Sequence, residues 1–486
     1  MRRRIPASLA VAALLAVAVR SKRLRRRRAD HPVSRISRAG RNAQLARIGL
    51  DVGSTYAAAS ARKLFASAPR RMEIDAERQL RTAEQIAERL GQMKGALMKV
   101  GQMASYLDDG LPEPVRLALA ELQSNAPPMS AELAAEVITS ELGRPPEVLF
   151  VEWDPEPIAA ASIGQVHRAV FRDPDSGVER AVAVKVQYPG VAEAIAADLQ
   201  NTDLIGMFLR QTFSSLDPAE LVAEIKQRLA EELDYRRERD NQQRFVDFYR
   251  GHPFFSVPAV VHSLCTGRVL TTDLAVGATW REALTWEQDE RDLIGEGLFR
   301  FVFRSLYRMQ AFNGDPHPGN YLFHGDGRIT FLDFGLVRYF SGEEIAVFAG
   351  LVKAAAVDHD PGAFRGLVER AGLLLPGAPV DTDEVGDYFS DFYAPVAEDA
   401  PMTWTKEYAS QIVRHTFDRT SPIAQYATVP RAFVFIQRIN LGLYALLGDL
   451  GATGNYRRMA EELWPFADGA PSTSMGRAEA AWLRIG

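Results

Sequence analysis

Three oxygen-bearing side chains in the C-terminal half have the types and spacing for phosphate chemistry. Asp315 stands inside Asn-Gly-Asp-Pro-His-Pro-Gly-Asn, Asn320 ends that segment, and Asp333 begins Asp-Phe-Gly. Phosphoryl transfer needs a carboxylate that orients the attacking hydroxyl, and oxygen ligands that hold Mg²⁺ on the phosphates. The spacing predicts that Asp315 performs the first task and that Asn320 and Asp333 bind the metal.

The segment between Asn320 and Asp333 explains how two distant ligands could share one ion. Residues 321–332 predict a strand pair around Gly325-Asp326-Gly327, a sequence suited to a tight reversal. A hairpin brings its two ends together. A surface loop rich in Pro, Gly and Asp is the alternative interpretation, but both pieces at this spacing favour a Mg²⁺-nucleotide site.

Lys185 is the candidate contact to the phosphates of ATP. It lies in the hydrophobic run Ala-Val-Ala-Val-Lys-Val, after a strand that begins at Gly164 and a turn, where a kinase keeps its phosphate-binding lysine. A strand lysine more often faces solvent, so this lysine needs an acidic partner. The predicted helix 231–238 supplies Glu238 as that partner. Asp234 lies four residues earlier on the same face, whereas Glu232 points elsewhere.

The run from Ala159 to His167 stands where a kinase covers the phosphates. Small side chains let backbone N–H groups approach an anion, although a single glycine gives little access to positive φ. Plain packing is the alternative. The candidate cofactor-binding residues here are Ala160, Ala161, Ser162, Ile163, Gly164 and Val166.

A further motif, Lys99-Val-Gly-Gln, lies in a predicted helix. Lys99 and Gln102 share a face, and Gly101 permits another backbone to come close. Taken alone, the motif is typical of a helix-packing site.

Composition restricts the class of protein. The chain has 486 residues, 47% of them hydrophobic, which is typical of a globular protein of several structural units. Cys265 is the only cysteine, so an intramolecular disulfide and a cysteine-based metal site are excluded. Residues 1–50 contain fourteen Lys or Arg and one acid, which is a net charge of +13. Because the whole chain has a net charge of −5, the remaining 436 residues have a net charge of −18. An acidic body argues against nucleic acid as a partner.

The positive charge surrounds an apolar run from Ile5 to Val19, flanked by Arg2-Arg3-Arg4 and the basic cluster at residues 20–28. A fifteen-residue helix spans roughly 22 Å, which is shorter than the roughly 30 Å hydrocarbon core. The charges favour anionic headgroups and keep the following chain on the cytoplasmic side. We expect a peripheral or anchored membrane protein. A disordered basic tail, a cleaved signal and a mis-assigned start codon are the alternatives.

The remaining pattern predicts an α+β protein. Residues 42–147 have helical periodicity, with Ser130 placed to cap a helix from Ala131 to Leu142. Strands are expected at residues 148–153, 164–171, 181–187, 257–261 and 269–274, and a long helix at 218–249. The parts are an N-terminal segment at 1–41, a helical extension at 42–147, a β-rich lobe with inserted helices at 148–276, a helical lobe at 277–468 and a tail at 469–486.

Taken together, these segments resemble the UbiB/AarF family of atypical kinases. The motifs that carry the resemblance run in family order from about Leu90 to Tyr456. They are Lys99-x-Gly-Gln102, the Ala-rich run through Val166-His167, Val184 to Val191, Glu232-Leu-Asp-Tyr235 with Glu238 and Asn241, and Asp315 to Asn320 with Asp333-Phe-Gly335.

The resemblance implies a two-lobed protein-kinase-like fold with ATP and Mg²⁺ as cofactors. Lys185 would pair with Glu238, and an N-terminal leader would fold over the active site, where Lys99 meets Glu232 and Asp234. Such a lid would disfavour protein substrates. The family is associated with ubiquinone biosynthesis and lipid homeostasis, so membrane lipids, prenyl-lipid intermediates and lipid-biosynthesis proteins are the implied partners.

Two departures from common protein kinases stand out. Lys185 and Glu238 are 53 residues apart, which requires an inserted helical piece, and no Ala-Pro-Glu segment follows Asp333. Two other functions stay open. One is a small-molecule phosphotransferase of the aminoglycoside-kinase type, in which Asn313 would replace a histidine. The other is a nucleotide-binding pseudokinase scaffold for a lipid-synthesis complex.

Overall fold

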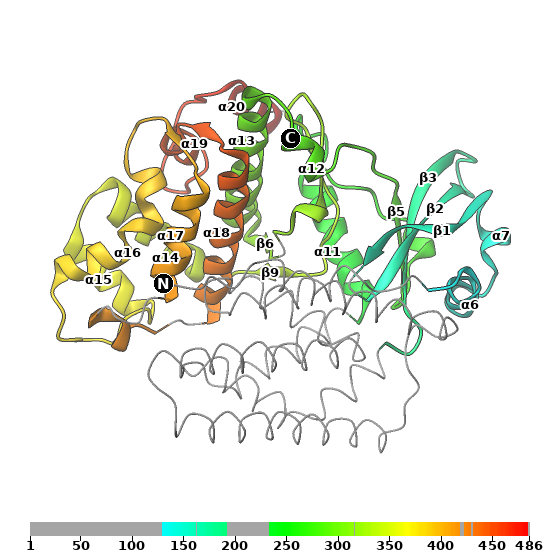
Figure 1. Ribbon diagram of the computed structural model, residues 1–486, viewed down its shortest axis with the longest axis horizontal. Coiled ribbons are helices and arrows are strands. Elements are labelled where there is room, and N and C mark those ends of the chain that lie inside the picture. Colours follow the sequence, from blue (N-terminus) through cyan, green and yellow to red (C-terminus); the bar gives the residue numbers. More distant parts are fainter. Residues whose placement is uncertain are drawn as a thin grey trace, which may run out of the picture.

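The computed structural model describes residues 129–161, 163–191, 233–314, 316–417, 422–428 and 431–484. A β-sheet occupies one side of this part of the chain and a group of helices the other (Figure 1). The smaller lobe contains α6 (Ala131–Leu142), α7 (Pro146–Leu149), β1 (Glu152–Ala161), β2 (Gly164–Arg172), β3 (Glu179–Gln187), α11 (Tyr235–Phe248), η2 (His262–Leu264) and β5 (Val269–Asp273). The short strand β4 (Phe255–Ser256) instead pairs with Ile329 and Thr330 of the helical lobe.

The sheet of the smaller lobe is antiparallel, in the order β1-β2-β3-β5. Its central strands β2 and β3 place Lys185 directly opposite Val166, and β5 places Leu270 on the other side of Lys185. α6 packs against β3 and β5. It begins at Ser130, whose hydroxyl accepts from the Leu133 N–H, and this helix confirms the predicted bounds.

The helical lobe follows from residue 280. Its helices are α12 (Trp280–Ala283), α13 (Gln288–Arg304), α14 (Gly342–Val352), α15 (Pro361–Arg370), α16 (Thr382–Ala397), α17 (Lys406–Phe417), α18 (Arg431–Leu450), α19 (Tyr456–Glu461) and α20 (Ser474–Leu483). Short segments with other helical geometry are η3 (Ser305–Met309), η4 (Pro318–Asn320), η5 (Lys353–Val357) and η6 (Pro422–Gln425). Its short strands are β6 (Ala311–Asn313), β7 (Tyr321–Phe323), β8 (Ile329–Phe331), β9 (Val337–Tyr339), β10 (Met402–Thr403) and β11 (Thr453–Gly454).

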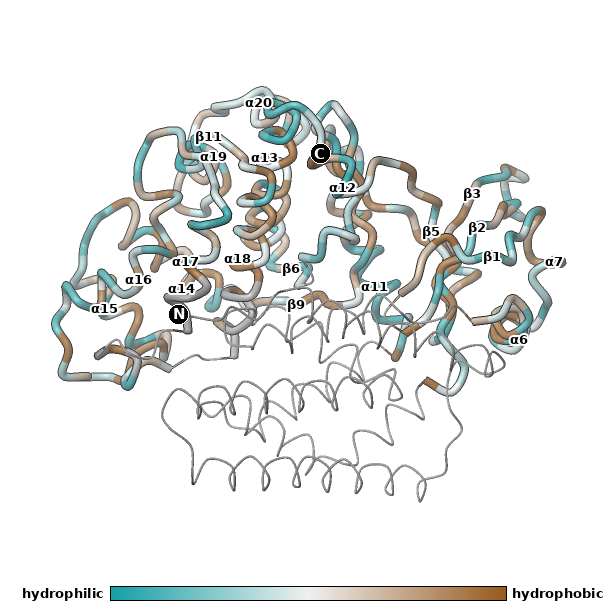
Figure 2. The backbone as a smooth tube through the Cα atoms, viewed as in Figure 1, coloured by the Kyte–Doolittle hydropathy of each residue, from teal (hydrophilic) through white to brown (hydrophobic). Residues whose placement is uncertain are grey.

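Two hydrophobic cores meet along α11. Tyr235, at its first turn, belongs to the core of the smaller lobe. Phe245 near its end, and Tyr249 beyond it, belong to the core of the helical lobe. In Figure 2 the strands β2 and β3 and the helices α13 and α18 carry hydrophobic segments that alternate with hydrophilic ones. α11 therefore connects the two lobes through its packing as well as through the chain.

Several predicted elements are wrong. Residues 146–149 form α7, and the first strand begins at Glu152, because Pro145-Pro146 starts a helical turn before the β pattern can begin. Residues 257–261 form only an isolated bridge, between Val260 and Thr272. The long helix predicted at 218–249 does not pass through Asp234, which adopts an extended backbone and caps α11. Residues 218–232 lie outside the described residues.

The segment 469–486, described from the sequence only as a tail, contains a helix that the sequence analysis did not predict. Residues 474–483 form α20, which begins at the cap Thr473 and buries Met475, Gly476 and Glu479 against the helical lobe. The apolar positions alone did not indicate this helix, because one of the side chains that fix it is a carboxylate. Among the described helices none is both long and apolar enough to cross a membrane, and residues 5–19 lie outside that part of the chain.

Candidate functional site

Lys185 and Glu238 form an ion pair at the junction of the sheet and α11. The Lys185 ammonium donates to both carboxylate oxygens of Glu238, at 2.7 and 2.8 Å. The side chains are 17% and 6% exposed, so water screens the pair weakly. Burial disfavours the charge of Lys185, but the carboxylates of Asp333 and Glu238 outweigh it and raise the pKa of Lys185 well above its usual range. The ammonium also lies 5.0 Å from the ring centroid of Tyr235.

Asp333 is the second carboxylate near this lysine. Its Oδ2 lies 3.6 Å from Lys185 Nζ. Its Oδ1 accepts the Gly335 N–H at 2.8 Å, and the Asn313 side-chain amide donates to its backbone carbonyl. These bonds hold the carboxylate at the end of β8 with one oxygen directed to the lysine. The structure thus brings together Lys185, Glu238 and Asp333 from three distant segments.

α11 is also bonded to the Asp-Phe-Gly segment. The Asn241 amide donates to the Phe334 carbonyl at 3.0 Å, and its oxygen accepts from the Tyr339 hydroxyl at 3.0 Å. The rings of Phe245 and Phe334 lie 4.7 Å apart, centroid to centroid. Any displacement of α11 would therefore disturb both the lysine pair and the backbone next to Asp333.

Asn320 reaches the same region through the predicted hairpin, which the structure contains. β7 and β8 pair with Tyr321 opposite Phe331, and the Leu332 N–H donates to the Asn320 carbonyl at 2.9 Å. Asn320 is thus bonded to the residue immediately before Asp333. An amide oxygen and a carboxylate at one end of a hairpin are ligands suited to Mg²⁺, which keeps the rest of its shell for phosphate and water.

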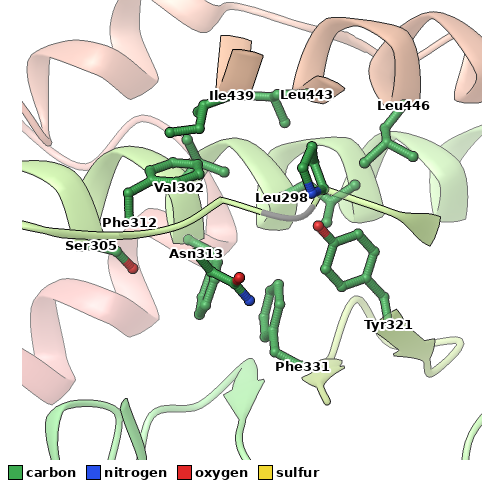
Figure 3. A pocket seen from close by; sticks show the side chains of 12 residues that line it. Leu298, Val302, Ser305, Phe312, Asn313, Tyr321, Phe331, Ile439, Leu443 and Leu446 are labelled. Carbon is green, nitrogen blue, oxygen red and sulfur yellow. The ribbon is translucent and has the colours of Figure 1, made fainter. Parts of the chain in front are cut away.

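Pro316, between β6 and η4, packs against α18 of the helical lobe. α18 approaches it so closely that a Cβ on Gly442 would lie 2.2 Å from Pro316 Cγ. A small apolar cavity under the loop is lined by side chains such as Phe312, Asn313, Tyr321 and Phe331, with Ile439 and Leu443 from α18 (Figure 3). Asp315 itself lies outside the described residues, so its predicted role stays a prediction.

The Ala-rich run forms a tight hairpin and not an open loop. Ala160 pairs with Gln165 and Ala161 with Gly164, so β1 and β2 stay paired up to positions 161 and 164. Ser162 lies outside the described residues, and Ile163 is buried. A Cβ on Gly164 would lie 2.3 Å from the Val186 carbonyl oxygen and 2.8 Å from the Tyr235 hydroxyl oxygen. Glycine is needed here for close packing of β2 on β3, a reason different from backbone flexibility.

The predicted leader site is only partly described. Lys99, Gly101, Gln102 and Glu232 lie outside the described residues. Asp234 does not share a helix face with Glu238. It precedes α11, and its carboxylate accepts the Arg236 N–H at 3.1 Å. An acid four residues before Glu238 can lie on the helix or can cap it, and the sequence spacing is the same in both cases. The prediction that Asp234 lies on the helix face with Glu238 is therefore wrong.

Sequence reasoning missed a set of hydrogen bonds between β2 and Met129, which precedes α6. The Gln165 side chain is buried and bonds both backbone groups of Met129, at 2.8 Å to N and 3.3 Å to O. Its amide also contacts His167 Nε2 at 2.9 Å, and the His167 ring stacks on Trp153 at 4.7 Å. Burial lowers the pKa of His167. The sequence signal that could have indicated this link is the pair of polar residues, Gln165 and His167, at strand positions that face the interior.

The sequence of the chain is similar to that of known atypical kinases. A family model described as the ABC1 atypical kinase-like domain matches residues 121–364. The atypical kinase COQ8B, mitochondrial, of Rattus norvegicus is 37% identical over 285 residues, which cover 56% of this chain and 51% of that protein. The atypical kinase COQ8, mitochondrial, of Saccharomyces cerevisiae is 31% identical over 289 residues, 58% of this chain and 56% of that protein. The chain thus spans about half the length of these relatives.

A solved structure gives a longer match. The complex of Rv3197 with erythromycin, from Mycobacterium tuberculosis, superposes with a TM-score of 0.59 and is 32% identical. The match covers 81% of this chain and 98% of that one.

Proposed function

The chain belongs to the ABC1 family of atypical kinases, which has a kinase-like fold, and we propose that it binds Mg²⁺-ATP between its lobes and transfers or hydrolyses the terminal phosphate. The observation that carries the proposal is the position of Lys185, held by Glu238 and within 3.6 Å of Asp333. A lysine fixed in this way contacts the α- and β-phosphates in kinases.

Each residue has one task in this proposal. Lys185 neutralises phosphate charge, and Glu238 keeps its ammonium in place. Asn320 and Asp333 would hold Mg²⁺, which would supply positive charge next to the phosphates. Asp315 orients the attacking hydroxyl or water. The backbone of the β1–β2 hairpin, from Ala160 to Val166, covers the phosphates.

The acceptor follows from features outside this site. No Ala-Pro-Glu segment, a feature of common protein kinases, follows Asp333. We therefore do not expect a peptide as the acceptor. We propose that the activity supports isoprenoid-quinone or lipid metabolism at a membrane that residues 5–19 contact. Flotation of the full chain with anionic vesicles, but not with neutral ones, is the expected result, and equal recovery with both would refute the electrostatic part.

Calorimetric titration of ATP into the purified protein, with and without Mg²⁺, tests nucleotide binding. Removing the charge with Lys185→Met should weaken binding roughly 10- to 100-fold, the range for a hydrogen bond to a charged group. Lys353→Met is the matched control, because Lys353 is 46% exposed and paired with Asp358. Equal affinity in the Lys185 variant and the control would refute the role of Lys185.

One observation favours a second function, small-molecule phosphotransfer of the aminoglycoside-kinase type. The solved relative was determined in complex with erythromycin, a small molecule. Incubating the protein with Mg²⁺-ATP and a panel of soluble alcohols separates the two functions. Multiple turnovers on one alcohol would favour this second function over lipid metabolism. Slow hydrolysis that disappears in Asp315→Asn would instead exclude a pure scaffold.

A further inference from the structure

The helix α20 contacts the residues that directly follow α11, the helix that carries Glu238. α20 follows α19 in the helical lobe and lies near α13 (Figure 1), to which the ion pair of Glu479 with Arg300 joins it. We propose that α20 positions α11 from behind, with Glu479 and Trp482 as the positioning residues, and thereby keeps the Lys185–Glu238 pair assembled. The consequence for nucleotide binding rests on the proposed function, whereas the consequence for α11 does not.

Glu479 fixes α20 to the helical lobe. Its side chain is 1% exposed, and its Oε2 accepts from the guanidinium of Arg300 at 3.0 Å. Arg304 donates to its other oxygen. Burial alone would raise the pKa of Glu479, but its bonds to His252 and Arg304 and the nearby charge of Arg300 lower that pKa to about 2. A carboxylate held ionised in the interior fixes its partners firmly, since a lost partner would leave a buried charge unpaired.

His252 extends this cluster to the end of α11. Its Nδ1 accepts two backbone N–H groups, from Phe254 at 3.2 Å and Phe255 at 3.0 Å. The proton therefore resides on Nε2, which donates to Glu479 at 3.2 Å. The His252 N–H in turn donates to the carbonyl of Tyr249, the residue that caps α11. A neutral histidine thus connects Glu479 to the last turn of α11.

Trp482 makes a second, independent contact. Its indole N–H donates to the Arg250 carbonyl at 3.0 Å. Its ring meets His252 edge-on at 4.6 Å and lies 6.5 Å from the ring of Tyr249. The approach of α20 is close, since a Cβ on Gly476 would lie 2.7 Å from the Arg300 guanidinium. Two side chains three residues apart, on one face of α20, therefore fix this helix against the residues that follow α11.

The end of α11 matters for Glu238 because the helix is rigid over the distance between them. Tyr249 lies eleven positions after Glu238, roughly 16 Å along the helix axis. The Tyr249 hydroxyl also bonds Ser305 Oγ at 2.7 Å. Contacts at one end of α11 can therefore set the position of the carboxylate at its other end.

Hydrogen–deuterium exchange of the full chain tests the proposal without nucleotide. Trp482→Ala removes the indole bond and ring contacts, and Leu483→Ala, at a neighbouring side chain that is 53% exposed, is the matched control. We expect amides of residues 242–248 to exchange about fivefold faster in Trp482→Ala, the factor for one ordinary hydrogen bond, with α18 unchanged. Equal exchange in both variants, or acceleration spread evenly over the chain, would overturn the proposal.

A second variant and a nucleotide titration complete the test. Glu479→Gln retains the shape but loses the charge, and we expect it to accelerate exchange in α11 and α20 together. Apparent affinity for Mg²⁺-ATP should fall about twofold or more in both variants and not in Leu483→Ala, because a smaller fraction of molecules has the pair assembled. A wild-type chain that binds no nucleotide would refute the proposed function while the exchange result still decides the role of α20. Unchanged affinity alongside faster exchange in α11 would refute the link to the site.

Discussion

Replacing Glu238 by glutamine removes the carboxylate closest to the Lys185 ammonium. The change keeps the volume of the side chain and one hydrogen-bond acceptor, so packing around α11 is retained. Lys185 is left with Asp333, whose nearest oxygen lies 3.6 Å away against 2.7 Å for Glu238. The ammonium is then expected to move toward Asp333 and away from the place where it would meet phosphate.

The magnitude follows from the burial of the pair. Removing one partner of a buried ion pair costs roughly 3–5 kcal/mol, and the side chain of Glu238 is only 6% exposed. Glutamine retains an acceptor and Asp333 retains a charge, so the expected loss in free energy of unfolding is smaller, about 2–3 kcal/mol, the range for a hydrogen bond to a charged group. Asp240→Asn on the same helix is the control. Asp240 is 58% exposed, and exposed pairs contribute under about 1 kcal/mol.

Denaturant unfolding of four proteins measures the pair itself. Wild type, Glu238→Gln, Lys185→Met and the double variant form a cycle that isolates the coupling between the two side chains. We expect a coupling of at least about 1 kcal/mol, within the range for contacting residues. A coupling below about 0.5 kcal/mol, or an Asp240→Asn variant as unstable as Glu238→Gln, would refute the reasoning.

The other predictions concern packing and pH. Gly164→Ala should lower the free energy of unfolding by about 1–3 kcal/mol, because its Cβ would meet a backbone oxygen at 2.3 Å. Gly386→Ala, with open space around its Cβ, should be neutral or stabilising in denaturant melts. Acid should destabilise the chain through Glu479, whose pKa falls from 4.5 to about 2 on folding. A depressed pKa contributes stability above pH 4.5 that is lost as pH falls toward 2, about 3 kcal/mol in all. Glu479→Gln should flatten this part of the stability–pH curve, and an unchanged curve would contradict the assignment. Tyr339→Phe should weaken protection of the Asn241 amide region in exchange experiments, since Tyr339 donates to Asn241, and unaltered exchange would show that this bond is dispensable.

Local signals in the sequence predicted much of the fold around the site. Ser130 and Gly143 bound α6 as a cap and a left-handed terminus do, and Gly327 supplies the positive φ of the β7–β8 turn. The pairing of Lys185 with Glu238 was also predictable, because a lysine in an apolar strand needs a nearby acid. These cases depend on short-range geometry or on one strong electrostatic requirement.

Long-range polar packing was not predictable in the same way. Glu479 finds its charged partners in α13, which no periodicity in either helix indicates, so residues that fold as α20 were predicted to be a tail. Asp234 had the spacing of a helix-face acid and caps the helix instead. In both cases a polar residue is placed by what packs against it, and a single sequence contains no direct signal for that.

The stabilisation of the folded chain by Mg²⁺-ATP tests the central claim most directly. The account predicts that ATP with Mg²⁺ raises the melting temperature of the wild type, that chelating Mg²⁺ removes most of the shift, and that Asp333→Asn abolishes the Mg²⁺-dependent part. Asp326→Asn is the control, because Asp326 lies in the exposed β7–β8 turn and pairs with Arg328. A Mg²⁺-dependent shift in Asp333→Asn equal to that of the wild type would contradict the account.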